Sequence, residues 1–134
     1  ASSRKDFIEK IKKTNGIWNI NSYGEYFLQI YEKYSKTYSM ACDKIADERQ
    51  RFTKELSKIK GLKVFPSQAN YVLCKISGKI SSTDLTLKLL DKANIFIKDL
   101  SGKKGFEKGV YIRLAVKAPE ENDLLVDALK TFLK

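Results

Sequence analysis

VYIRLAV, residues 110–116, is the most strand-like run in this chain, and it carries a single charge, Arg113. Aliphatic and aromatic residues surround that arginine, as in a strand that lies within a sheet. Only four of the 26 basic residues are arginines, so lysine serves at most cationic positions. A guanidinium is planar, always charged and able to donate two parallel hydrogen bonds to a carboxylate or phosphate. Arg113 therefore pairs with an internal carboxylate, faces outward from the sheet, or binds an anionic ligand.

Short strand patterns and helical patterns alternate on both sides of this run. Ser81-Ser82-Thr83-Asp84 resembles a capping box and predicts a helix start, and Pro119 followed by two glutamates predicts another. The predicted elements are strands over 62–65 and 70–76, a helix over 81–93, strands over 95–99 and 110–116, and a helix over 119–133. This ββαββα order predicts a small, mainly antiparallel sheet covered by helices.

The N-terminal part of the chain is predicted to be helical. Apolar residues at helical spacing indicate helices over 3–13, 23–34 and 36–58, and Gly61 is expected to cap the last one. The aromatic stripe of the second helix and the apolar stripe of the third, which includes Ala41, Cys42 and Ile45, are interpreted as core. We therefore expect an α+β fold. Residues 1–35 are assigned to an N-terminal helical segment and interdomain connector, and 36–134 to a small domain.

The composition limits which partners the protein can be expected to bind and where in the cell it is expected to be found. The net charge is +10, but the lysines are mixed with 16 acidic residues and do not alternate with aromatics, which argues against nucleic acid. No run approaches the roughly 18 apolar residues that a membrane span needs. The N-terminus does not resemble a signal peptide, so we expect a cytoplasmic protein. Cys42 and Cys74 are expected to be buried free thiols there.

Residue types also limit the chemistry. The chain has no histidine, which removes the commonest general base and metal ligand. Its glycine-containing segments, such as Ser101–Gly105, read as turns and not as phosphate-binding loops. Taken alone, the sequence shows no catalytic set, no metal site and no cofactor site.

Several stretches, in this order, are typical of one family. They are Trp18–Asn21, Glu48-Arg49 with Phe52 and Leu56, Pro66–Leu73, Ile95–Asp99 followed by Tyr111–Val116, and Pro119–Asn122 with Leu125 and Leu129. Together they resemble the C-terminal small domain of fold-type I pyridoxal-phosphate enzymes, in the class I/II aminotransferase group. Histidinol-phosphate aminotransferases and threonine-phosphate decarboxylases belong to that group.

The resemblance implies roles for four residues. Arg113 stands where the family's arginine clamps the α-carboxylate of the substrate. Lys98 stands where histidinol-phosphate aminotransferases usually carry an arginine near the substrate phosphate, although it is equally readable as a surface lysine at a strand end. Asn70 and Asn19 lie in segments that approach the active-site mouth in relatives, and a turn or capping role is the alternative for each.

The resemblance also implies what lies outside this sequence. In the family, the lysine that forms the Schiff base with pyridoxal phosphate and the aspartate beside the ring nitrogen belong to a large domain. Neither sequence context occurs here, so we expect this chain to be a fragment that does not bind the cofactor alone. The expected parent is a homodimeric aminotransferase acting on an amino acid or a phosphorylated one. A decarboxylase of the threonine-phosphate type and a non-catalytic basic binding module are the alternatives.

Overall fold

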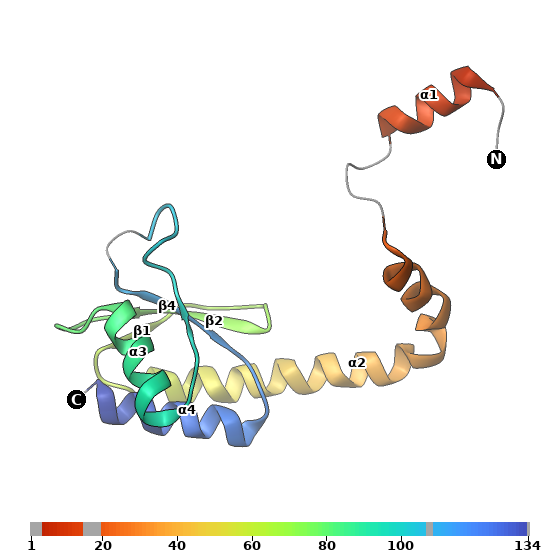
Figure 1. Cartoon of the computed structure of the whole chain (residues 1–134). Coiled ribbons are helices and arrows are strands. Elements are labelled where there is room, and N and C mark those ends of the chain that lie inside the picture. Colours follow the sequence, from red (N-terminus) through yellow and green to blue (C-terminus); the bar gives the residue numbers. More distant parts are fainter. Residues whose placement is uncertain (1–3, 15–19, 107–108, 134) are drawn as a thin grey trace. The chain divides into compact units, whose positions relative to one another are not determined.

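The computed structural model of the protein describes residues 4–14, 20–106 and 109–133 (Figure 1). Contacts divide the chain into two compact units, Ala1–Tyr38 and Ser39–Lys134. The first unit holds helix α1 (Lys5–Thr14), which has no buried residue, and the beginning of helix α2 (Ser22–Ser57). The second unit holds the rest of α2 and every other element.

Helix α2 is continuous, so the prediction of two helices separated near residue 35 is wrong. No glycine or proline interrupts the chain between Gly24 and Gly61. Ser35, which could favour a break, instead donates its hydroxyl to the carbonyl of Glu32 at 2.9 Å and stays within the helix. The α-helix ends at Ser57, before Gly61, because the next amides bond to the carbonyl three residues back instead of four, as Ile59 N does to Leu56 O at 3.0 Å.

The second unit is built on a four-stranded antiparallel sheet in the order β1-β2-β4-β3. The strands are β1 (Leu62–Val64), β2 (Tyr71–Ile76), β3 (Lys98–Asp99) and β4 (Tyr111–Ala115). Helices α3 (Ser82–Ala93) and α4 (Pro119–Phe132) follow β2 and β4. The α+β prediction is confirmed.

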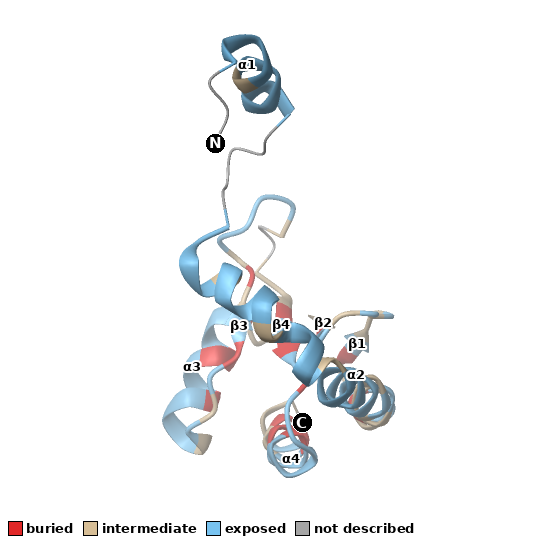
Figure 2. Ribbon diagram, turned by 90° about the vertical axis from the view of Figure 1, so that its right-hand side faces the viewer, coloured by how far each residue is buried: buried red, intermediate tan, exposed pale blue. Residues whose placement is uncertain are grey.

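Strand alternation gives the sheet one buried and one open face. Along β4, Ile112 and Leu114 are buried, whereas Arg113 and Ala115 are exposed. The buried residues pack against α2, α3 and α4, which lie on one side of the sheet (Figure 2). The core residues on these helices are Phe52, Leu56, Leu85, Leu89, Leu125, Val126 and Leu129.

Three further predictions are corrected by the structure. Strand β3 has two residues instead of five, because the amide of Ile95 donates to Leu89 O at the end of α3 instead of to a strand. Cys42 is exposed, whereas Cys74 is buried as expected. The apolar stripes upstream of residue 46 are not core: Tyr26 is 61% exposed and Ile45 is 39% exposed.

Candidate functional site

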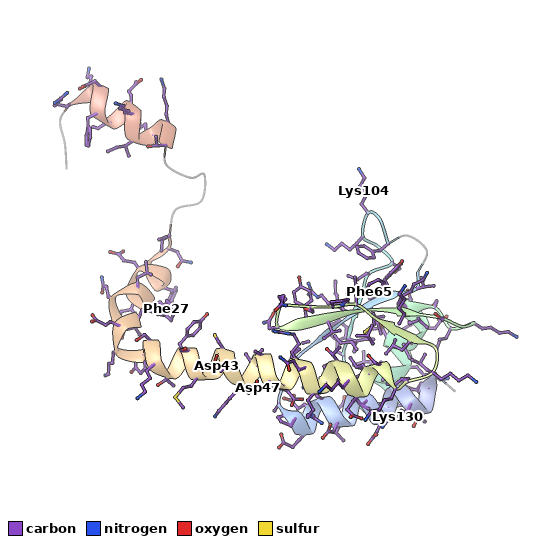
Figure 3. The ribbon with its side chains drawn as sticks, turned by 180° about the vertical axis from the view of Figure 1, so that it is seen from behind. Phe27, Asp43, Asp47, Phe65, Lys104 and Lys130 are labelled. Atoms are coloured by element: carbon purple, nitrogen blue, oxygen red, sulfur yellow. The ribbon has the colours of Figure 1, made fainter. Side chains whose placement is uncertain are left out.

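Arg113 lies in the middle of β4 on the face of the sheet that the helices leave open. Its side chain is exposed, and its register partners are Leu73 on β2 and Lys98 on β3. The guanidinium carbon lies 4.9 Å from the centre of the Tyr71 ring, a cation–π distance. Figure 3 shows the side chains of this region, with Phe65 at the sheet and Lys130 on the side of the helices.

Within the described part of the chain, no carboxylate forms an ion pair with Arg113. Arg51 behaves differently, since it binds Glu48 at 2.8 Å and Asp123 at 2.7 Å. These carboxylates, first that of Glu48, raise the pKa of the Arg51 guanidinium. Arg113 therefore forms no internal ion pair with a described carboxylate, and the N–H groups of its guanidinium remain able to bind an anion.

Lys98 is the cross-strand neighbour of Arg113 on the edge strand β3. Residues directly opposite in a sheet point to the same face, with Cβ atoms roughly 5 Å apart. Lys98 is exposed and, like Arg113, forms no ion pair with a described carboxylate. Two adjacent like charges are unfavourable unless an anion lies between them. The pair therefore favours a ligand that carries negative charge.

Asp99, next to Lys98, fixes the short strand β3. Its carboxylate accepts hydrogen bonds from Ser82 Oγ at 2.7 Å, Thr83 Oγ1 at 2.6 Å, Ser101 Oγ at 2.8 Å and Ser101 N at 2.9 Å. Partial burial opposes ionisation, but these hydrogen bonds outweigh it and hold the pKa of Asp99 well below its usual range. They tie the start of α3 to β3. Sequence reasoning missed this cluster, although three consecutive hydroxyl residues at a helix start were visible.

Asn70 lies at the end of the β2–β4 ladder, where its carbonyl accepts from Val116 N at 2.9 Å. The preceding turn is tied to α2 by Arg49, whose Nη1 donates to Gln68 O at 3.3 Å and to Ala69 O at 3.2 Å. Sequence reasoning used Arg49 only as part of a motif and missed this contact. Asn19 lies outside the described residues. The structure thus brings Arg113 and Lys98 together, while Asn70 marks the end of the same ladder.

The described lysines do not fit the lysine that would hold pyridoxal phosphate. Such a lysine reacts as the neutral amine, which needs a desolvated or electropositive pocket. Every described lysine is exposed except Lys75, which is half-buried and has its Nζ 5.8 Å from the centre of the Tyr111 ring. The described residues also include no group of histidine, cysteine or acidic side chains that could hold a metal ion.

Comparisons with known proteins agree with the motifs. The family described as Aminotransferase class I and II matches residues 2–129. The chain is 35% identical over 131 residues to the L-serine phosphate decarboxylase of Campylobacter jejuni, covering 96% of this chain and 33% of that protein. It is 31% identical over 134 residues to the histidinol-phosphate aminotransferase of Caldanaerobacter subterraneus, covering 99% and 36%. A solved decarboxylase structure from Sulfurospirillum multivorans matches with a TM-score of 0.80 at 33% identity, covering 96% of this chain and 37% of that chain.

The chain therefore belongs to the class I and II aminotransferase family, whose members depend on pyridoxal phosphate. It spans about a third of the length of the two curated relatives named above. The family resemblance inferred from the motifs is confirmed. Within the part that the structure describes, no helix is long and apolar enough to cross a membrane.

Proposed function

We propose that this chain is the small domain of a larger pyridoxal-phosphate enzyme, and that Arg113 binds the α-carboxylate of its amino-acid substrate. The observation that carries the proposal is an exposed arginine on the open sheet face that no described carboxylate neutralises. A bidentate pair between the guanidinium and a carboxylate fixes both the position and the orientation of the substrate. Lys98 adds a second positive charge for a phosphate on the same substrate.

The proposal assigns the remaining parts of the active site to partners. In it, the large domain of the same protein supplies the cofactor and its lysine, and a second subunit completes a homodimer. A groove of about 810 Å³, whose lining includes Ala41, Ile45 and Pro119, lies between α2 and the start of α4 and offers an apolar surface to a partner. Closure of the small domain over bound substrate would exclude water from the reaction.

Amino-group transfer is the first candidate reaction, and decarboxylation is the second. Decarboxylation is kept as a candidate because the chain is 35% identical to a protein named as an L-serine phosphate decarboxylase. Pyridoxal phosphate supplies the electron-withdrawing chemistry for both reactions when it is bound. Assay of the complete protein separates them: carbon dioxide and phosphoethanolamine from L-serine phosphate indicate decarboxylation. Formation of glutamate from 2-oxoglutarate indicates amino-group transfer.

A non-catalytic basic binding module finds less support in the distribution of charge. The described lysines lie on all four helices and on β1, β2 and β3. Binding to a nucleic-acid backbone needs these charges on one continuous surface. Within the second unit, Lys75 and Lys98 share the open face with Arg113, whereas the lysines of α3 and α4 lie on the helix side of the sheet. This division between two sides favours the enzyme interpretation.

The role of Arg113 is tested by replacing it in the complete enzyme and measuring binding by calorimetry. Arg113→Gln is expected to weaken L-serine phosphate binding roughly ten- to hundredfold, because a charge-assisted bidentate pair is lost. Binding of phosphoethanolamine, which lacks the carboxylate, should be unchanged. Lys63→Gln, on the edge strand β1 of the same sheet, is the matched control and should affect neither ligand. Equal weakening of both ligands by Arg113→Gln would contradict the assignment.

A further inference from the structure

We propose that Tyr71 is a positioning residue for Arg113: its ring orients the guanidinium without neutralising it. This inference rests on the proposed function, because it explains how Arg113 stays ready to bind a carboxylate. Among the described residues the guanidinium forms no hydrogen bond and no ion pair, and the Tyr71 ring lies 4.9 Å from its Cζ to the ring centre. Tyr71 itself is half exposed at the start of β2.

The sheet register makes this contact possible. Tyr71 pairs with Ala115, two residues beyond Arg113 on β4, so Tyr71 and Arg113 are diagonal neighbours on the open face. Diagonal neighbours in an antiparallel pair lie about 7–8 Å apart at the backbone, which long and aromatic side chains span. The residue directly opposite Arg113 on β2 is Leu73, which offers no polar group. Tyr71 is thus the residue on β2 that can hold the guanidinium from the side.

A ring holds an arginine differently from a carboxylate. A carboxylate would occupy the N–H groups and cancel the charge, so that a substrate carboxylate would have to displace it. A ring contacts the flat face of the guanidinium through its π electrons and leaves the N–H groups at the edge free. Arg113 therefore keeps both its full charge and its bidentate edge while losing rotational freedom. Reduced freedom before binding lowers the entropy cost of binding.

The backbone around Tyr71 is itself held in place. The carbonyl of Tyr71 accepts a hydrogen bond from Ser67 Oγ at 2.5 Å, and Ser67 Oγ also accepts from Ala69 N at 3.1 Å. Arg49 of α2 donates to the carbonyls of Gln68 and Ala69. These contacts fix the turn that leads into β2. The ring therefore starts from a defined backbone position, which is what a positioning residue requires.

The first test is made by NMR on the 134-residue chain and needs no cofactor. A ring stacked on the guanidinium shifts the δ-methylene protons of Arg113 upfield. Tyr71→Leu should abolish that shift, whereas Tyr71→Phe, which keeps the ring, should preserve it. Unshifted δ-methylene protons in the unsubstituted chain would overturn the inference. The amide spectrum of each variant reports whether its sheet is intact.

The second test compares the same variants in the complete enzyme. Tyr71→Leu should raise KM for L-serine phosphate roughly two- to fivefold with kcat little changed, the range of an exposed cation–π contact. Tyr71→Phe should restore the original KM. If Arg113→Gln weakens carboxylate binding but Tyr71→Leu does not, the role of Tyr71 is wrong and the proposed function stands. If Arg113→Gln has no effect on carboxylate binding, the proposed function fails first.

Discussion

Asp99 is a single carboxylate that joins two elements far apart in the sequence. It accepts hydrogen bonds from residues at the start of α3 and from Ser101, and they hold its pKa low. Because the pKa is depressed in the folded state, its stabilisation is complete above the ordinary aspartate pKa of about 4. That stabilisation is lost progressively as the pH falls from there toward the folded-state pKa.

Replacement of Asp99 by asparagine should therefore destabilise the chain in a pH-dependent way. We expect a loss of about 1–3 kcal/mol at pH 6, the usual range for unsatisfied hydrogen-bond donors. The difference between the original chain and the variant should shrink at pH 3, when measured by urea unfolding at both pH values. Asp91→Asn is the matched control, since Asp91 is exposed and pairs only with Lys92 among the described contacts. An equal difference at both pH values would show that the charge of Asp99 is not responsible.

The two cysteines should differ in reactivity. Cys42 is exposed, whereas burial raises the pKa of the Cys74 thiol to about 12, so almost no thiolate forms there near neutral pH. Iodoacetamide at pH 8 should therefore modify Cys42 alone in the folded chain and both cysteines in urea. Peptide mass spectrometry measures the two sites separately. Comparable labelling of Cys74 without denaturant would contradict its burial on the helix-covered face of β2.

At the residue scale, the sequence allowed some sites to be predicted and not others. Arg113 was detectable because one charge in an apolar run is a local signal. The hydrogen bonds to Asp99 were not, because their donors Ser82 and Thr83 lie 17 and 16 residues away and meet it only after α3 packs. The cation–π contact between Tyr71 and Arg113 depends on register, which a strand pattern does not specify.

Helix α3 begins with a cap that can be tested directly. Ser81 Oγ accepts from the amide of Asp84 at 3.0 Å, which confirms the predicted helix start and its cap. The second hydrogen bond differs from that of a capping box, because the Asp84 carboxylate accepts from the Ser81 hydroxyl, at 2.7 Å, and not from the Ser81 backbone amide. Ser81→Ala should lower the free energy of unfolding by about 1 kcal/mol. Ser57→Ala is the control, because Ser57 donates only to Thr53 O within α2 and caps no amide. Similar effects of both changes in urea unfolding would argue against the cap.

At the element scale, the starts of helices α3 and α4 were easier to predict than the length of strand β3. The capping box and Pro119 marked the starts of α3 and α4 through local chemistry. The length of β3 depended on a competing bond, since Asn94 takes a left-handed conformation with φ of 58° and turns the amide of Ile95 toward α3. The apolar residues at 95–97 predict a strand, but the sequence pattern does not show to which carbonyl each amide donates its hydrogen bond.

The second unit should fold without the first. All residues of the core cluster lie between Phe52 and Leu129, inside Ser39–Lys134. A chain of residues 39–134 should therefore unfold cooperatively with a Tm within about 5 °C of the whole chain, a shift corresponding to about 1 kcal/mol for a domain of this size. Calorimetry of the two chains measures this. Removal of residues 119–134 is the contrasting control and should abolish the transition, because it deletes the core residues of α4.

At the scale of the whole molecule, periodicity overstated the core. The stripe that contains Ala41 and Ile45 has the same spacing as Phe52 and Leu56, yet only the latter two are buried. The reason lies in the start of α4, whose Asn122 and Asp123 contact Glu48 and Arg51 of α2. The residues of α2 that precede Glu48 do not take part in these hydrogen bonds to α4. An apolar face predicts that something covers it, not which part of a protein does so.

The two edge strands of the sheet, β1 and β3, affect how readily copies of the chain can pair with one another. An edge strand exposes unpaired amides and carbonyls that another chain can extend into a larger sheet. Here the edge strands have only three and two residues, and each carries a lysine, Lys63 on β1 and Lys98 on β3. Short, charged edges disfavour pairing between copies. Lys98 therefore has a second role beside the proposed substrate contact: its charge helps to keep each copy of the sheet from extending into a fibre.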